Sequence, residues 1–298
     1  MKILVVGANG QVGFELMRAQ WPAGVALTGV TRPVLDLETP QTIVAALGAG
    51  APRYDLVINA AAYTAVDKAE SEPERAFAVN RDGARELAKA AADMGAGLIT
   101  FSTDYVFDGA LQRPYREDDA IAPLSVYGRS KAEGEVAQRA ANPRHIILRT
   151  SWVYGAHGAN FVKTMLRLGA ERDELRVVAD QHGAPTAAAD IAAAVVIIAA
   201  RLADGQMDRD TLWGTYHLTG SGATTWAGFA DAIFAHQARV TGRRLRVIAI
   251  PTAEYPTPAR RPANSRLDTM LIGVKLGITL PAWEASLGRV LDALLPSA

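Results

Sequence analysis

Short apolar runs alternate with amphipathic helical patterns along the first half of the chain. The runs that predict strands lie at residues 2–6, 26–30, 55–59, 98–101 and 144–148. The patterns that predict helices lie at residues 11–20, 39–48, 66–70, 73–94 and 127–140. Because the strands are apolar on both faces and alternate with helices, they predict an α/β fold with a doubly wound parallel sheet.

The pattern becomes looser after residue 150. Helices are expected at residues 161–168, 190–202 and 225–238, strands at 175–178 and 214–218, and a proline-rich loop at 251–262. We therefore expect a first domain of residues 1–150 and a smaller C-terminal α/β lobe made mainly of residues 151–298. Elements from about residues 175–205 are expected to return to the first domain.

Composition excludes several classes of function. The 298 residues are 49% apolar, enough for a large core, and their net charge of zero argues against nucleic-acid binding. Cysteine is absent, so disulfide and thiolate chemistry are excluded and a reducing compartment fits. The first residues show no signal-type segment, and the apolar stretch at 191–200 is too short to span a bilayer. We expect a cytoplasmic protein without membrane contacts.

A glycine-rich turn follows the first strand directly and opens a helix. Strand, glycine turn and helix are the context of a dinucleotide site, where glycines let the backbone approach a pyrophosphate at the helix N-terminus. The spacing is G-x-x-G-x-x-G rather than G-x-G-x-x-G, and a turn without a ligand is the alternative. We expect a Rossmann-type cofactor site that includes Gly7, Gly10, Gln11, Val12 and Gly13.

Arg32 lies just past the second strand, where such folds meet the adenosine ribose. An acidic side chain there would bind the ribose of NAD, whereas an arginine suits the 2′-phosphate of NADP. No acidic residue occurs before Asp36, so we expect NADPH, with NADH left open. An ordinary surface charge is the alternative for Arg32, and Asp36 and Leu37 are expected along the adenine.

Ligands of doubly wound sheets bind beyond the carboxyl ends of the strands. Residues 60–62, 102–104 and 150–152 lie at such ends. Small side chains after the third strand leave room for a cofactor, although a compact turn would look the same. The residues expected at the cofactor here are Ala61, Ala62, Tyr63 and Thr64.

Tyr127 and Lys131 are four residues apart and share one face of a predicted helix. A free phenol has a pKa of about 10, and a nearby ammonium lowers it, which gives a proton donor near neutral pH. Thr103, at the end of the fourth strand, is placed to bind the same substrate oxygen. We expect a catalytic site for proton transfer to or from a carbonyl or alcohol oxygen, the alternative being a surface helix with an unremarkable pair.

Arg261 follows Arg260 in the proline-rich loop. Its forked donors suit a substrate diphosphate, and a surface loop with solvated charges is an equally open alternative. No spacing of histidine and carboxylate residues resembles a metal site.

The glycine turn and the Thr/Tyr/Lys site together resemble the short-chain dehydrogenase/reductase superfamily, in its extended branch that modifies sugar nucleotides. Longer motifs closely resemble the dTDP-4-dehydrorhamnose reductase family over essentially the whole chain. These motifs lie at residues 59–70, 102–107, 149–154, 180–186 and 261–267.

The resemblance implies reduction of the C4 ketone of dTDP-4-dehydro-β-L-rhamnose to dTDP-L-rhamnose, a precursor of lipopolysaccharide or cell-wall polysaccharide. NADPH, or less strictly NADH, is the implied cofactor. Tyr127 is then the proton donor, while Lys131 lowers its pKa and holds the nicotinamide ribose. Thr103, Asp104 and Trp152 are implied contacts of the small-molecule nucleotide sugar.

Mg²⁺ and a homodimer stay open. Some members of the family dimerise through Mg²⁺ held by helix carboxylates, and Glu15 matches one position. The second position, near Asp190, is displaced by one residue, so we predict no metal site.

Three alternatives to this function remain. The first is another nucleotide-sugar 4-ketoreductase or an epimerase; an epimerase would retain its NAD. The second is a dehydratase, which is disfavoured because no glutamate follows Asp104. The third is a non-catalytic regulatory subunit that binds NADP; such a protein could dispense with Tyr127 and Lys131, so the presence of both residues argues against it.

Overall fold

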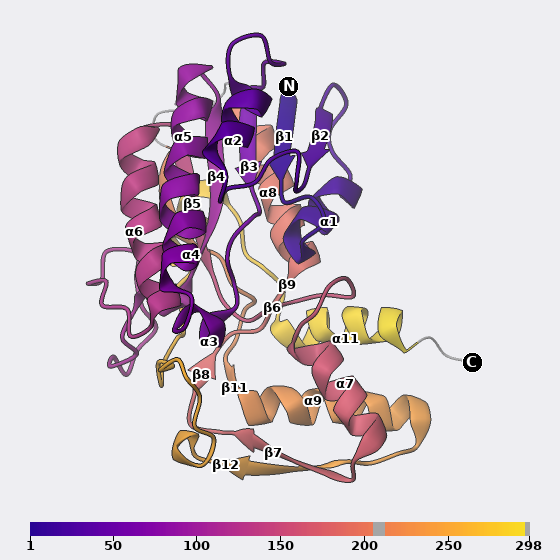
Figure 1. Ribbon diagram of the computed structural model, residues 1–298. Coiled ribbons are helices and arrows are strands. Elements are labelled where there is room, and N and C mark those ends of the chain that lie inside the picture. Colours follow the sequence, from indigo (N-terminus) through magenta and orange to yellow (C-terminus); the bar gives the residue numbers. More distant parts are fainter. Residues whose placement is uncertain (205–211, 296–298) are drawn as a thin grey trace.

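A six-stranded parallel sheet forms the centre of the computed structural model, which describes residues 1–204 and 212–295 (Figure 1). Each neighbouring pair of strands is parallel. The strands in spatial order are β10 (Gly214–His217), β5 (His145–Thr150), β4 (Gly97–Thr103), β3 (Leu56–Asn59), β1 (Lys2–Val6) and β2 (Ala26–Val30). The predicted α/β fold with a doubly wound parallel sheet is confirmed.

Alternating side chains of the strands build a core on each face of the sheet. Ile3 and Val5 of β1 belong to one core, which helices α1 (Gln11–Arg18), α8 (Ala188–Asp204) and α10 (Met270–Leu276) cover. Leu4 and Val6 belong to the other, which helices α2 (Pro40–Leu47) and α5 (Ala84–Asp93) cover. Because helices cover both faces of the sheet, the side chains on both sides of each strand are buried, and the strand sequences are continuous apolar runs. None of the helices within the described ranges is long and apolar enough to cross a membrane.

The helix expected at residues 73–94 is interrupted. It consists of α4 (Pro73–Phe77), a π-helical turn (Ala78–Gly83) and α5. The next long helix, α6 (Val126–Ala141), packs so closely here that a Cβ on Gly134 would lie 2.0 Å from the carbonyl oxygen of Asn80. The apolar spacing of residues 73–94 predicts one continuous helix, because it carries no information about this contact with α6. A short helix, α3 (Val66–Ala69), precedes α4.

A further core lies in the C-terminal lobe, below the sheet in Figure 1. Its helices are α7 (Phe161–Glu171), α9 (Trp226–Thr241) and α11 (Trp283–Leu294). They pack with the parallel pair β7 (Glu174–Val178) and β12 (Arg246–Ile250). The short strand pairs between the lobe and the sheet are β6 (Val153–Tyr154) with β9 (Thr186–Ala187), and β8 (His182–Gly183) with β11 (Thr224–Thr225).

Two elements from beyond residue 150 join the layers of the first half. Strand β10 pairs with β5, with Tyr216 opposite Leu148 and His217 opposite Arg149. Helix α8 packs against α1, whereas β7, also within residues 175–205, pairs with β12 in the lobe. The strand predicted at residues 214–218 therefore belongs to the main sheet, a position that the sequence did not indicate because a strand pattern does not encode its partner. As a division into functional units, the boundary near residue 150 stays a prediction.

Candidate active site

The turn between β1 and α1 requires glycine at two positions. Gly7 has a φ of +77°, and a Cβ there would lie 2.8 Å from the backbone nitrogen of Ala61. A Cβ on Gly13 would lie 2.1 Å from the carbonyl oxygen of Gly7. The turn therefore lies directly against the end of β3, and its backbone is open to a ligand on the other side.

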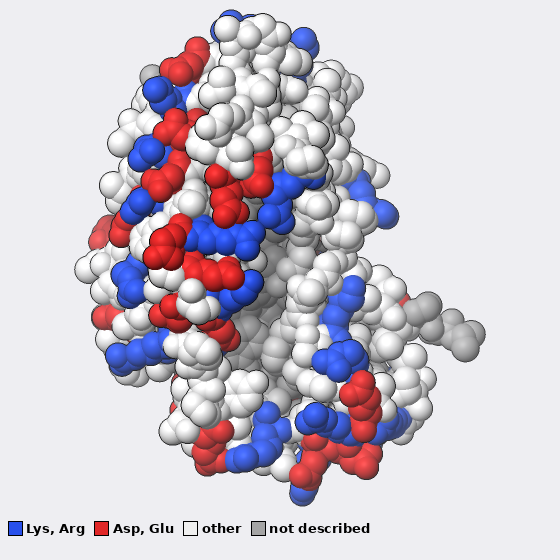
Figure 2. Space-filling view, in the orientation of Figure 1, with Lys and Arg blue, Asp and Glu red and all other residues white. Residues whose placement is uncertain are grey.

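A cavity of about 650 Å³ lies at the carboxyl ends of the strands. Figure 2 shows this face hollowed between the two halves, with charged side chains of both signs beside the hollow. Nearly all the predicted cofactor residues line the cavity: Gly7, Gly10, Gln11, Val12, Arg32, Asp36, Leu37, Ala61, Ala62, Tyr63, Thr64, Tyr127 and Lys131. Gly13 does not line it and instead packs beneath the turn. The cavity runs from the end of β2 to α6, and its glycine turn and position fit a dinucleotide.

The loop after β6 forms part of the cavity, which the sequence analysis missed. Gly158 and Ala159 line the cavity beside the glycine turn. Asn160 donates to Gln11 Oε1 at 2.9 Å, and the ring of His157 stacks on Phe14 with centroids 4.0 Å apart. The second half of the chain thereby covers the start of α1. The only local signal is a glycine-rich run at residues 155–158.

Asn80 connects the cofactor side of the cavity to α6. Its Oδ1 accepts from the backbone N–H of Tyr63 at 2.9 Å. Its Nδ2 donates to the carbonyl oxygen of Tyr63 and to Ser130 Oγ, each at 3.0 Å. Asn80 is 2% exposed, so these bonds are shielded from water and fix Tyr63 beside the residue that precedes Lys131.

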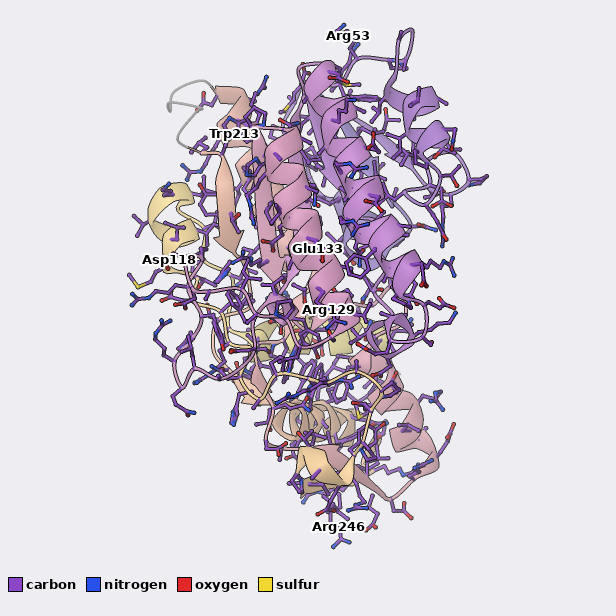
Figure 3. All side chains as sticks on the ribbon, turned by 60° about the vertical axis from the view of Figure 1, so that its left-hand side comes forward. Arg53, Asp118, Arg129, Glu133, Trp213 and Arg246 are labelled. Atoms are coloured by element: carbon purple, nitrogen blue, oxygen red, sulfur yellow. The ribbon has the colours of Figure 1, made fainter. Side chains whose placement is uncertain are left out.

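Helix α6 presents Tyr127 and Lys131 to the cavity. Ser125 caps the helix by accepting from the N–H of Gly128 at 3.1 Å. Arg129 and Glu133, both exposed, mark the outer face of this helix in Figure 3. Tyr127 and Lys131 lie on its inner side, as their spacing predicts, and both line the cavity.

The Lys131 ammonium donates to the carbonyl oxygen of Phe101 at 2.7 Å. Burial lowers the pKa of Lys131 to about 8, and the charge of Glu135 opposes this shift. Lys131 therefore remains charged at neutral pH.

The pKa of Tyr127 differs from the expectation that Lys131 lowers it. Burial raises the pKa of Tyr127 to about 12, a hydrogen bond with Thr103 acts in the opposite direction, and the charge of Asp104 adds to the increase. The Lys131 ammonium is directed at the backbone of β4, and it is not among the causes of the shift. The expected lowering is wrong for this structure, and Thr103 is the group that favours the phenolate.

Thr103 and Asp104 lie at the end of β4, behind Tyr127. The Thr103 hydroxyl hydrogen-bonds Asp104 Oδ1 at 2.9 Å and accepts from the N–H of Tyr105 at 3.2 Å. Asp104 is 2% exposed. Burial raises the pKa of Asp104 to about 7, although the nearby hydroxyls of Ser265 and Thr103 lower it.

A buried ion pair fixes α6 against the sheet. Arg149 on β5 donates to both carboxylate oxygens of Glu135, at 2.9 and 2.7 Å. Ser102 donates to the same carboxylate at 2.6 Å. These bonds join β4, β5 and the helix that carries Tyr127 and Lys131.

None of the four residues expected at the substrate lines the cavity: Thr103, Asp104, Trp152 and Arg261. Arg261 pairs with Asp67 at 2.7 Å, so its guanidinium already has a carboxylate partner. Trp152 has a φ of +48° and stacks on Trp226 with ring centroids 3.6 Å apart. The contacts of Arg261 and Trp152 with a substrate stay predictions, and Trp226 is an aromatic neighbour that the sequence analysis did not find.

The described part of the chain contains no group of three or more histidine and carboxylate side chains that could hold a metal ion. Asp190, near one position considered for Mg²⁺, accepts from Arg289 at 2.6 Å and from Ser286. Its carboxylate therefore serves to attach α11 to α8.

Comparison with known proteins connects this geometry to a family. The family described as RmlD substrate binding domain matches residues 1–295. The chain belongs to this family. A relative from Sinorhizobium fredii, dTDP-4-dehydrorhamnose reductase, is 53% identical over 296 residues, which cover 99% of this chain and 98% of the relative.

Solved structures of RmlD-type proteins show the same fold. The dTDP-4-dehydrorhamnose reductase of Clostridium acetobutylicum superposes with a TM-score of 0.89 at 39% identity, covering 99% of both chains. The enzyme of the same name from Bacillus anthracis, in complex with NADP, has a TM-score of 0.89 at 35% identity and covers 98% of this chain and 99% of its own. The two halves described above are therefore arranged as in these relatives.

Proposed function

We propose that the protein reduces the C4 ketone of dTDP-4-dehydro-β-L-rhamnose to dTDP-L-rhamnose with NADPH, the last step of dTDP-rhamnose synthesis. The observation that carries the proposal is that Tyr127, Lys131 and the glycine turn line one cavity. The relative from Sinorhizobium fredii, which is 53% identical, is a dTDP-4-dehydrorhamnose reductase, and this supports the proposed substrate. The NADP bound to the Bacillus anthracis enzyme supports the proposed cofactor.

The glycine turn and the start of α1 are suited to the pyrophosphate of the cofactor, because backbone N–H groups and the helix dipole favour an anion there. Arg32 is the residue for the 2′-phosphate, which favours NADPH over NADH. Lys131, charged at neutral pH, is placed to hold the nicotinamide ribose. NADPH, when bound, supplies the hydride that reduces the ketone.

Tyr127 provides the proton. With a pKa of about 12 its phenol is protonated at neutral pH, so it begins as a donor. The alkoxide formed at C4 is more basic than a phenolate, so proton transfer to it is favourable. The hydrogen bond from Thr103 then stabilises the phenolate that remains.

The substrate side is proposed to lie towards the C-terminal lobe, with Thr103, Trp152 and Arg261 as contacts and Asp104 buried behind Thr103. Neither Mg²⁺ nor a second copy of the chain is needed for these steps. Family membership also supports a cytoplasmic location, where nucleotide sugars are made.

The test is a coupled assay. The 4-keto substrate is prepared from dTDP-glucose with the upstream dehydratase and epimerase, and loss of NADPH absorbance is followed after the protein is added. We expect one NADPH consumed for each dTDP-L-rhamnose formed. Interconversion of sugars without NADPH loss, together with NAD that copurifies, would instead identify an epimerase, and NADPH binding without turnover would identify a regulatory subunit.

A further inference from the structure

Asp104 is a buried carboxyl group in contact with the hydroxyl of Thr103. We propose that Asp104 is a positioning residue: in its protonated form it donates to Thr103 and thereby turns the Thr103 hydroxyl towards Tyr127 and the reacting oxygen. The inference rests on the proposed reduction, and it adds a switch that sets the direction of the hydrogen bonds at the proton donor.

The hydrogen bonds of Thr103 can be counted. Its hydroxyl has one donor and two acceptor positions. One acceptor position is used by the N–H of Tyr105 at 3.2 Å. Asp104 Oδ1, at 2.9 Å, and the phenol of Tyr127 share the remaining acceptor position and the single proton.

The charge of Asp104 decides how these two positions are shared. If Asp104 is ionised, it can only accept, so the Thr103 proton points to Asp104 and Thr103 offers the Tyr127 phenol an acceptor position only. A Tyr127 proton held at that position is directed away from the substrate. If Asp104 is protonated, it fills the second acceptor position of Thr103, and the Thr103 proton points to the oxygen of Tyr127. The Tyr127 proton is then free for the substrate oxygen, and the developing phenolate gains a donor.

The surroundings of Asp104 raise its pKa into the neutral range, so the protonated form is populated at neutral pH and dominates below it. The titratable and charged groups that face it are Tyr105 in its own turn, Tyr127 from α6, and Arg261, which acts on Tyr105 from the proline-rich loop. Over residues 1–204 and 212–295, Asp104 forms no ion pair. Ser265 lies near enough to lower its pKa, yet Oδ2 has no partner at hydrogen-bond distance and angle. Burying an oxygen without a hydrogen-bond partner costs less free energy when the group is a neutral carboxylic acid than when it is a charged carboxylate.

The first test is the pH dependence of kcat/KM for NADPH-dependent reduction of the 4-keto sugar nucleotide. Because burial raises the pKa of Asp104 to about 7, we expect kcat/KM to fall by about tenfold per pH unit above that value. Asp104→Asn keeps a donor towards Thr103 at every pH, and its kcat/KM should stay level until Lys131 loses its proton, near pH 8. Asp108→Asn is the control, because this carboxylate accepts from Tyr115 at 2.5 Å and does not touch Thr103. An identical alkaline limb in wild type and Asp104→Asn would overturn the proposal.

The second test asks whether Asp104 acts through Thr103. In a Thr103→Val background the hydroxyl is gone, so adding Asp104→Asn should no longer move the pH profile. If the profile still moves, Asp104 acts by another route and the proposal is wrong.

A third measurement does not depend on turnover. The folded-state pKa of Asp104 lies above its unfolded value of about 3.9, so wild-type stability falls as pH rises from that value to about 7. Asp104→Asn removes this loss, and its Tm advantage over wild type should be larger at pH 8 than at pH 5. An equal Tm difference at both pH values would show that Asp104 is already ionised at pH 5, which overturns the proposal even if the wild type reduces no substrate. If the proposed reduction alone is wrong, turnover is absent and this Tm difference is still observed.

Discussion

Arg149→Met should destabilise the fold strongly, because it leaves a charge buried without its main partner. Glu135 and Arg149 are 1% and 2% exposed in their side chains, and two N–H···O bonds of 2.9 and 2.7 Å join them. Breaking such a buried pair from one side costs about 3–5 kcal/mol. Ser102 and Arg139 still donate to Glu135, at 2.6 and 3.1 Å. We therefore expect the lower end of that range, about 3 kcal/mol.

The assay is urea unfolding followed by circular dichroism, with Arg149→Met, Glu135→Leu and the double variant. The double variant has no unpaired charge, so it should be more stable than Arg149→Met alone. Burial acts to raise the folded-state pKa of Glu135, but pairing with Arg149 outweighs it and lowers that pKa. The contribution of Glu135 to stability is therefore present above the unfolded value, about 4.3, and is lost as pH falls below it. The gap between wild type and Arg149→Met should accordingly narrow in acid. The reasoning would be refuted if Arg149→Met lowered the free energy of unfolding by less than about 1 kcal/mol at pH 7. It would also be refuted if the loss in the double variant equalled the sum of the losses in the two single variants.

Three further predictions concern the site. Tyr127→Phe should lower kcat by ~10²–10⁴-fold with NADPH binding retained, and near-normal turnover would mean that Tyr127 is not the acid. Lys131→Met should raise the KM for cofactor and remove the loss of kcat/KM near pH 8, where Lys131 deprotonates; an unmoved profile with reduced rate would limit Lys131 to positioning. Arg32→Ala should weaken the binding of NADPH by about 1.5–3 kcal/mol and the binding of NADH by less, as measured by fluorescence titration. Equal losses of binding free energy for the two cofactors would show that Arg32 does not contact the 2′-phosphate.

The layers of the sheet could be predicted because their signals are local. A strand that is buried on both faces needs an unbroken apolar run, and β1, β3 and β4 have one. The partner of β10 was not predictable, because His217 and Arg149 are polar residues that become buried opposite one another only when the two strands pair. Hydropathy alone would leave both at the surface.

The residues of the site likewise include some that local spacing predicts and others that only tertiary packing brings together. Tyr127 and Lys131 could be placed together because one helical turn separates them, whatever the rest of the fold does. Asn80 and Glu135 looked like surface residues of helices, since only packing against α6 and β5 buries them. Trp226 lies 74 positions beyond Trp152 in the chain, so no spacing rule connects the two rings that stack.

The most direct test of the proposed reduction follows the hydride itself. The protein is given the 4-keto sugar nucleotide and NADPH that carries deuterium at the transferable position of nicotinamide C4, and the product is analysed by NMR and mass spectrometry. The proposed reduction predicts dTDP-L-rhamnose with a single deuterium on C4 of the sugar and one NADPH consumed per product. An unlabelled product, or deuterium at any other carbon, would contradict it.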